Sequence, residues 1–237
     1  MIDIHCHILP DIDDGPKTFD ESVAMARMAA DDGITGIVAT PHLNEKLYNP
    51  VEISRRVFWL RHLLRKEKIP VSIMPGADVS VLFKPDQIEG FTINGTRYIL
   101  IEFAHSHLPR NANEILFQFL VKGYKPIITH PERNPSISTH PDLLTNLLGD
   151  NMYVQITAGS LTGDFGKDAR RCAEYLLRAG VVDVIATDAH STGRRKPKLS
   201  EGMQAAAEIV GPERAKQMVF DTPMKIISGM NFSRASL

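Results

Sequence analysis

The chain opens with MIDIHCHILPDIDDG (residues 1–15), in which a short apolar run ends in two histidines one residue apart. Side chains alternate along a strand, so we expect His5 and His7 to project to one side with Asp3. Ile2, Ile4 and Cys6 should project to the other side. Two imidazoles are then aimed at the same point. Because a His-x-His pair alone also fits an exposed polar strand end, the rest of the chain has to decide between these interpretations.

The composition describes a protein with a sizeable core and few cysteines. With 237 residues, 43% of them apolar, we expect a single domain spanning residues 1–237. The net charge of −1, with acidic and basic residues interspersed, argues against a general nucleic-acid binder. The only cysteines, Cys6 and Cys172, suit a reducing compartment. With no signal-peptide pattern and no apolar run of eighteen residues, we expect a cytoplasmic protein without membrane insertion.

Short β-branched runs alternate with helical patterns along the chain, which indicates repeated βα units around a parallel sheet. We expect strands at residues 2–5, 36–40, 71–74, 97–102, 126–129, 153–156 and 182–187. A first helix should follow Thr18, which forms a capping-box pattern with Glu21, and should end before Gly33. Further helices are expected at residues 51–66, 113–122, 142–148, 167–179, 200–210 and 213–219. An α/β barrel of seven strands, related to the (β/α)₈ fold, fits this order best, and an open doubly wound sheet is the alternative.

The C-terminal ends of the expected strands carry residues that bind metals, and parallel α/β folds place their reactive groups at these ends. Six of the seven strand ends contribute: His5, His7, His42, Asp78, Glu102, His130, Asp188 and His190. Only the sixth, which reads QITAG, contributes none. Asp14 brings the candidate ligands to nine. Each position alone fits a solvated loop end, but their recurrence at one level of the fold predicts a metal cluster.

Five imidazoles and four carboxylates, with bridging carboxylates and water, would serve two or three divalent ions. The absence of a thiolate and the number of imidazoles favour manganese, iron or zinc over calcium without choosing among the three. We take manganese as the first expectation, with iron or zinc as alternatives. Cys6 should face away from the cluster. A metal-bound water loses its proton near neutral pH and becomes a nucleophile, while a neighbouring ion polarises a phosphoryl oxygen.

Arginines follow two of these strand ends. Arg133 lies in THPERNP, and Arg194 and Arg195 lie in DAHSTGRRKP. The planar fork of an arginine binds phosphate oxygens bidentately, although a solvated surface position is the alternative for each. A basic rim beside a multinuclear cluster indicates a phosphatase.

The motifs MIDIHCHILPDIDDGP, ATPH, PGAD, LIEF, ITHPER and ATDAH follow one another at suitable spacing over essentially the whole chain. With them the sequence resembles the PHP (polymerase and histidinol phosphatase) superfamily. Within it, the chain is similar to the bacterial metal-dependent protein-tyrosine phosphatases of capsule and exopolysaccharide synthesis. The resemblance implies a distorted seven-stranded (β/α)₇ TIM-like barrel carrying three metal ions.

The resemblance also implies how the ligands are shared. The first ion would be held by His5, His7 and Asp188 with a bridging carboxylate, the second completed by Glu102 and His130, and the third held by Asp14, His42 and His190. The bridging position is usually glutamate in the family, whereas this chain has Asp78, which is one methylene shorter. Asp13 is an alternative to Asp14. The two phosphate-binding arginines of the family match Arg133 and Arg195, with Arg194 as the alternative to the latter.

In this interpretation metal-bound hydroxide attacks phosphotyrosine on the tail of a cytoplasmic tyrosine kinase that controls polysaccharide export. Phenolate, with a pKa of about 10, leaves without strong acid catalysis. One alternative is a small-molecule phosphomonoesterase such as a histidinol-phosphate phosphatase. Another is a catalytically silent binding module stabilised by metal. An amidohydrolase fits less well, because Glu102 stands where that group usually has a bridging lysine.

Two further patterns require an interpretation. Cys172 and Arg178 match the C-x5-R spacing of thiol-based phosphatases, but they lie in the helical pattern GKDARRCAEYLLRAG and not in a glycine-rich loop that could cradle phosphate. We therefore expect Cys172 to be half-buried core. A second His-x-His pair, His105 and His107, is expected at the mouth of the pocket.

Overall fold

The computed structural model describes residues 1–43, 49–104 and 106–234. Within these ranges the strands form two sheets, in which every pair is parallel. The smaller sheet has the order β1 (Ile2–Cys6), β2 (Gly36–Ala39) and β4 (Ser72–Pro75). The larger has the order β3 (His42–Leu43), β5 (Asp78–Ser80), β6 (Tyr98–Glu102), β7 (Lys125–Thr129), β8 (Tyr153–Thr157) and β9 (Val184–Ala186). The predicted α/β class with parallel strands is confirmed.

The hydrogen-bonded ladders differ from the seven strands predicted. The strands β3 and β5 were not predicted, and they pair with each other in one sheet while β2 and β4 pair in the other. Pro41 lies between β2 and β3, and Pro75 ends β4. Because proline has no backbone N–H to donate, each ladder is interrupted there, and β3 and β5 lie beyond the ends of the strands expected at 36–40 and 71–74.

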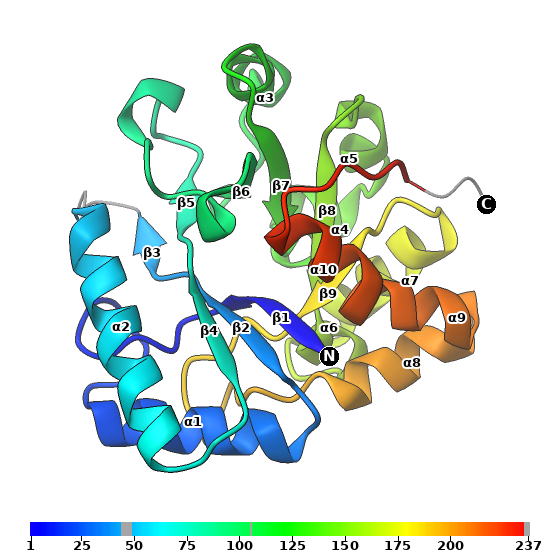
Figure 1. Ribbon diagram of the computed structural model, residues 1–237. Helices are drawn as coiled ribbons and strands as arrows, with labels where there is room; N and C mark the ends of the chain where they lie inside the picture. The colour runs from blue at the N-terminus through cyan, green and yellow to red at the C-terminus, as the bar shows by residue number, and fades with distance from the viewer. Residues whose placement is uncertain (44–48, 105, 235–237) are drawn as a thin grey trace.

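Helices follow the strands and surround them (Figure 1). They are α1 (Phe19–Asp31), α2 (Pro50–Lys66), α3 (Ala112–Val121), α4 (Pro135–Thr139), α5 (Asp142–Leu147), α6 (Ala158–Thr162), α7 (Lys167–Arg178), α8 (Ser200–Val210), α9 (Pro212–Lys216) and α10 (Thr222–Ile227). The longer helices lie where the sequence predicted them. The helix predicted at 213–219 instead ends at Lys216, and a π-helical turn at Gln217–Asp221 connects it to α10.

The start of α1 follows the capping pattern in its sequence. The Thr18 hydroxyl accepts a hydrogen bond from the backbone N–H of Glu21 at 3.2 Å. The Glu21 carboxylate accepts from Lys17 N–H at 2.6 Å, one residue earlier than in a capping box. Gly33 has a φ of +85°, as expected for a glycine just after a helix. The predicted helix is confirmed, with a one-residue shift in the reciprocal bond.

The apolar core consists of two clusters of buried side chains. One comes almost entirely from the strands and includes Ile2, Ile4 and Leu100. The other lies between helices and strands and includes Cys6. The expectation that Cys6 shares a face with Ile2 and Ile4 is therefore wrong, because the register of β1 shifts between Asp3 and Cys6 and breaks the alternation.

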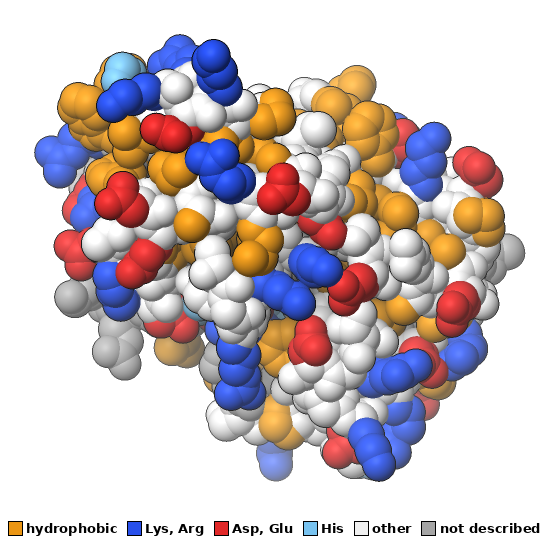
Figure 2. Space-filling view, turned by 90° about the horizontal axis from the view of Figure 1, so that it is seen from below, with side chains coloured by type: hydrophobic (Ala, Val, Ile, Leu, Met, Phe, Trp, Pro, Cys, Tyr) orange, Lys and Arg blue, Asp and Glu red, His pale blue; other side chains and the backbone are white. Residues whose placement is uncertain are grey.

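The surface carries no large region of one charge on the face seen from below, where acidic and basic side chains are interspersed (Figure 2). Such a mixed surface agrees with the net charge of −1. In the part of the chain that the structure describes, no helix has both the length and the apolar character needed to cross a bilayer.

Candidate metal centre

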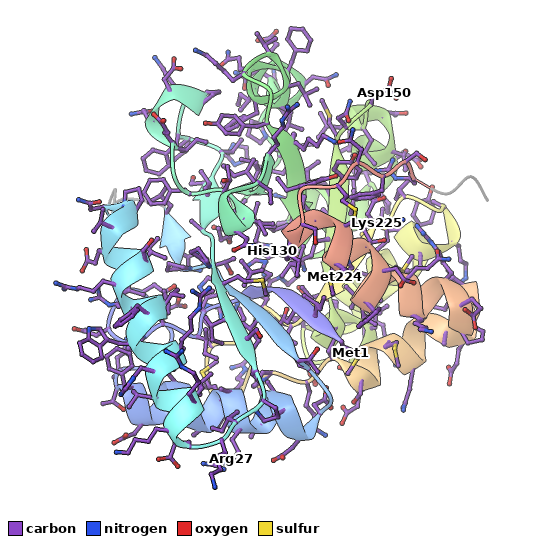
Figure 3. The ribbon with its side chains drawn as sticks, in the orientation of Figure 1. Met1, Arg27, His130, Asp150, Met224 and Lys225 are labelled. Atoms are coloured by element: carbon purple, nitrogen blue, oxygen red, sulfur yellow. The ribbon has the colours of Figure 1, made fainter. Side chains whose placement is uncertain are left out.

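The nine predicted ligands lie together at the C-terminal ends of the strands. Backbone hydrogen bonds bring the ends of β1 and β9 side by side, since Asp188 N–H donates to His5 at 2.8 Å and His7 N–H donates to Ala189 at 2.8 Å. His130 follows β7 and is labelled near the middle of the ribbon in Figure 3. The set is buried or partly buried, except Asp14, whose side chain is 62% exposed.

Two of these residues have left-handed backbone conformations. His130 has a φ of +35° and Asp188 a φ of +51°, and each follows the end of its strand. A positive φ is uncommon for residues other than glycine, and such strained conformations occur preferentially at functional sites. The chain therefore turns where these side chains join the cluster.

The first group of ligand atoms lies around Asp188. The Nε2 atoms of His5 and His7 are 3.1 Å apart. Oδ1 of Asp188 lies 3.3 Å from Nε2 of His5 and 3.2 Å from Nε2 of His7. One carboxylate oxygen thus faces both imidazoles of the His-x-His motif.

Asp78 occupies the centre of the cluster. Its Oδ2 lies 3.5 Å from Nε2 of His5, 3.5 Å from Nδ1 of His42 and 3.9 Å from Nε2 of His130. Gly76 allows the chain before Asp78 to approach closely, because a Cβ added there would lie only 2.8 Å from Val38 Cγ1. The short aspartate thus faces imidazoles from three strand ends.

The remaining ligands complete the cluster on its exposed side. Oδ1 of Asp14 lies 3.1 Å from Nε2 of His190 and 3.7 Å from Nε2 of His42. The Glu102 carboxylate lies 3.4 Å from Nδ1 of His42 and 3.4 Å from Nε2 of His130. His42 therefore faces Asp14 with one ring nitrogen and Glu102 with the other.

These separations suit divalent cations. Around an ion with bonds of about 2.1 Å, neighbouring ligand atoms lie roughly 3.0 Å apart in an octahedral site and roughly 3.4 Å apart in a tetrahedral one. The distances above fall mostly between 3.1 and 3.5 Å. Among the described residues, Asp78 Oδ2 and Asp188 Oδ1 are buried and receive no hydrogen bond. Buried carboxylate oxygens without a donor are the groups that a cation would satisfy.

The electrostatics of the cluster point the same way. Burial lowers the pKa of His7, but hydrogen bonds, above all with Asp13, outweigh it and raise that pKa to about 9. Burial likewise lowers the pKa of His42, but the two carboxylates facing its ring raise it to about 11. Burial would raise the pKa of Asp188, but contacts with His5 and an arginine hold it well below its usual range. Protons on His7 and His42 thus balance the charge of the buried carboxylates, and divalent cations could take over this role.

Two side chains orient the histidines from behind. The Asp13 carboxylate lies 2.7 Å from Nδ1 of His7, opposite the ring nitrogen that faces the cluster. The Gln155 side-chain oxygen lies 2.8 Å from Nδ1 of His5. Asp13 thus contacts the far side of the His7 ring, whereas Asp14 lies beside His42 and His190. Gln155 was missed, although a glutamine in the otherwise apolar strand YVQIT was a signal for it.

We expect Asp13→Asn to weaken metal binding by about 10- to 100-fold, because an outer partner fixes the ring and raises the basicity of a ligating histidine. The substitution keeps the shape of the side chain and removes its charge. Titration of the metal-free protein with Mn²⁺ measures the effect. Asp11→Asn, an exposed aspartate in the same loop, is the matched control. Unchanged affinity in Asp13→Asn would contradict a supporting role.

Two arginines converge on the cluster. Nη2 of Arg133 lies 2.7 Å and Nη2 of Arg195 2.6 Å from the same oxygen, Oδ2 of Asp188. The Arg133 guanidinium also lies 4.6 Å from the centre of the Phe165 ring, a contact that the sequence did not predict. The Nε atoms of both arginines are buried and donate to no described residue, while the side chains remain 13% and 27% exposed. Arg194 is exposed instead.

The other patterns in the sequence lie outside the cluster. Cys172 is buried within α7, and burial raises the pKa of its thiol to about 12, so the C-x5-R match forms no phosphate-binding loop. The predicted place of Cys172 in a core helix is confirmed, but the side chain is fully buried and not half-buried as expected.

The structure describes one residue of the second His-x-His pair. His107 is exposed, and its Nδ1 lies 2.8 Å from the Ser106 hydroxyl. His105 lies outside the described residues.

Comparisons with known proteins identify similar chains. A family model described as capsular polysaccharide synthesis, CpsB/CapC, matches residues 1–228. Over 219 residues, the chain is 38% identical to tyrosine-protein phosphatase YwqE of Bacillus subtilis strain 168, covering 90% of this chain and 86% of the relative. Over 238 residues, it is 30% identical to tyrosine-protein phosphatase CpsB of Streptococcus pneumoniae, covering 96% and 98%.

A solved structure is similar over almost the whole chain. It comes from a study of YwqE from Bacillus subtilis and CpsB from Streptococcus pneumoniae, described as unique metal-dependent tyrosine phosphatases. Its TM-score is 0.93 at 36% sequence identity, and the match covers 99% of this chain and 97% of the other.

Proposed function

The chain belongs to the CpsB/CapC family of capsular polysaccharide synthesis, and on this basis we propose that it is a metal-dependent protein-tyrosine phosphatase. The family resemblance inferred from its motifs is thereby confirmed. The observation that carries the proposal is that the buried carboxylate of Asp188, one of nine clustered candidate ligands, faces His5 and His7 with one oxygen and two arginines with the other. A cation cluster and paired guanidinium groups together suit a phosphate ester.

We propose that two or three divalent ions, with manganese first and iron or zinc as alternatives, bind at this cluster. The proposed ligands are His5, His7, Asp14, His42, Asp78, Glu102, His130, Asp188 and His190. Such ions lower the pKa of water and polarise a phosphoryl oxygen when they are bound. Asp78 is the proposed bridging carboxylate, because its Oδ2 faces three imidazoles.

Arg133 and Arg195 are the proposed phosphate-binding residues. Both guanidinium groups contact Oδ2 of Asp188 through Nη2, and the two side chains remain 13% and 27% exposed. A phosphate could therefore accept hydrogen bonds from both arginines while they keep their contacts with Asp188. Paired guanidinium groups orient the ester and stabilise charge on its equatorial oxygens.

The exposed side of the cluster favours a protein substrate over a small molecule. Asp14 is the most exposed of the ligands, and it lines a cavity of about 450 Å³ together with His190, Arg194 and Arg195. A phosphotyrosine that projects from a protein surface could reach such a site. Its phenolate, with a pKa of about 10, requires little help from an acid when it leaves.

The experiment that tests this function compares substrates on the metal-loaded enzyme. We expect kcat/KM for a phosphotyrosyl peptide to exceed that for the matching phosphoseryl peptide or for histidinol phosphate by at least about tenfold, because the better leaving group requires less acid catalysis. Mn²⁺- and Zn²⁺-loaded protein should be compared. Preference for histidinol phosphate would indicate a small-molecule phosphatase, and no turnover with either metal would indicate a binding module.

We also propose a cytoplasmic tyrosine kinase of polysaccharide export as the source of the phosphotyrosine. The family description, capsular polysaccharide synthesis, supports this partner. Both cysteines, Cys6 and Cys172, are buried free thiols, as a reducing compartment would allow.

For the architecture we propose one domain that forms a distorted seven-stranded barrel. Two observations support it. Only short links separate β2 from β3 and β4 from β5, so each pair can be counted as one interrupted strand. Backbone hydrogen bonds also connect the ends of β1 and β9, which lie in different sheets.

A further inference from the structure

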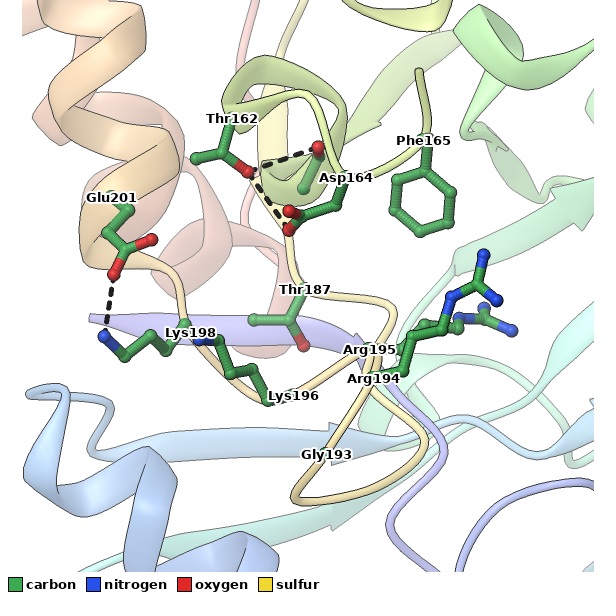
Figure 4. Close-up of a pocket in the computed structure, with 11 residues that line it drawn as sticks. Thr162, Asp164, Phe165, Thr187, Gly193, Arg194, Arg195, Lys196, Lys198 and Glu201 are labelled. Carbon is green, nitrogen blue, oxygen red and sulfur yellow. Dashed lines mark hydrogen bonds and ion pairs between the residues drawn. The ribbon is translucent and has the colours of Figure 1, made fainter.

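A second cavity lies beside the proposed phosphate-binding arginines. It measures about 320 Å³ and is enclosed between the segment that follows α6 and the loop before α8 (Figure 4). Arg194 and Arg195 line this cavity and also the one that contains Asp14 and His190. These two arginines therefore stand between the cavity and the metal ligands, and a peptide bound at the cluster could extend past them.

The lining of this second cavity is cationic. Four basic side chains contribute to it, against the carboxylates of Asp164 and Glu201. Lys198 pairs with Glu201 at 2.7 Å, and Asp164 accepts a hydrogen bond from the Thr162 hydroxyl. Both contacts are drawn in Figure 4.

Two of the cations in this cavity form no ion pair with a described residue. Arg195 pairs with Asp188 in the metal cluster. Arg194 and Lys196 are exposed and lie in no such pair, although the charge of Lys196 helps to lower the pKa of Glu201. With four basic and two acidic side chains, the lining keeps an excess of positive charge.

The loop that carries these cations is closed by its own backbone. Arg195 C=O accepts hydrogen bonds from His190 N–H at 2.8 Å and Ser191 N–H at 3.3 Å. The Ser191 hydroxyl donates to Arg194 C=O at 2.6 Å. Cations on a preformed loop lose less conformational entropy on binding than cations on a flexible one, which favours a specific site.

We propose that this cavity binds an anionic side chain of the protein substrate, a carboxylate or a phosphate, close in sequence to the phosphotyrosine. The proposal rests on the proposed phosphatase function and adds a sequence preference to it. Lys196 and Arg194 supply the charge, and Arg195 connects this subsite to the phosphate at the cluster. Phe165, at the boundary, gives the passing peptide an apolar wall.

The test uses phosphotyrosyl peptides in which one glutamate is moved from three residues before the phosphotyrosine to three after it, on an alanine background. We expect glutamate at one position to raise kcat/KM by about 3- to 10-fold, which is the range for a single, partly exposed charge pair. Phosphoserine at that position distinguishes the two anions, because a larger gain would identify phosphate as the preferred group. Tyrosine absorbance reports dephosphorylation of the tyrosine alone.

Lys196→Gln provides the matched variant. We expect it to lose most of the gain from glutamate while its turnover of p-nitrophenyl phosphate stays unchanged. Lys216→Gln, an exposed lysine on α9, should retain the gain. An equal gain at every position, or a full gain in Lys196→Gln, would overturn the subsite. The alanine peptide separates the two proposals, because its turnover survives failure of the subsite and disappears if the phosphatase function is wrong.

Discussion

Replacing Asp188 with alanine is expected to lower kcat for a phosphotyrosyl peptide by at least about 100-fold, as for the loss of a group that organises a catalytic ion. One oxygen of this carboxylate faces His5 and His7, and the other holds both arginines. The substitution therefore removes a proposed metal ligand and the anchor of the phosphate-binding groups together. Steady-state kinetics with Mn²⁺-loaded protein measure the loss.

Two further variants separate catalysis from folding. Asp188→Asn keeps the shape of the side chain but not its charge, and it should lose activity while its melting temperature remains measurable by circular dichroism. Asp168→Asn changes an exposed aspartate at the start of α7 and should leave kcat unchanged. Wild-type kcat in Asp188→Ala would exclude this carboxylate from the mechanism.

Removal of metal is the second change with a large expected effect. Chelation should reduce phosphatase activity to the background level, and Mn²⁺ should restore it, because bound ions would lower the pKa of the attacking water and polarise the phosphoryl group. Elemental analysis of protein purified without chelator should give two or three ions per chain. Because the ions would bind the folded cluster and not the unfolded chain, their loss also removes that contribution to stability, and the melting temperature should fall.

Circular dichroism of the metal-free protein provides the control, since retained helical signal shows that the fold persists. Ca²⁺ should restore less activity than Mn²⁺, because an imidazole-rich site suits transition metals better. Full turnover by protein shown to be free of metal would rule out the proposed cluster chemistry.

The nine candidate ligands could be grouped from the sequence because the C-terminal ends of parallel strands meet at one edge. Strand alternation also suggested that His5 and His7 share a face. It does not explain Asp188 and His190, because both residues follow the end of β9 and Asp188 has a left-handed backbone conformation. The distances of 3.1 to 3.5 Å between ligand atoms agree with this expectation.

Other parts of the site depend on contacts that no local pattern specifies. The Gln155 side chain contacts His5, which is 150 residues away in the sequence. The Arg133 guanidinium contacts the ring of Phe165, which follows α6. In β1 the register shift changes the side to which Cys6 faces, and the short strands β3 and β5 form after Pro41 and Pro75, beyond the predicted strands. Tertiary pairing decides such features.

The sequence alone also did not show which of Arg194 and Arg195 contacts Asp188. The two adjacent arginines differ only in the direction of their side chains. Hydrogen bonds to Arg195 C=O and a positive φ of 63° at Arg195 set these directions. Sequence patterns do not report such angles for residues other than glycine.

The self-closed loop has an evolutionary consequence. Because backbone bonds to Arg195 C=O hold Arg195 in place, the neighbouring side chains at positions 194 and 196 can change without disturbing it. Selection could then adjust which partners are recognised while the chemistry is conserved. Lineages with different polysaccharide machineries could diversify recognition through those two positions on an otherwise inherited scaffold.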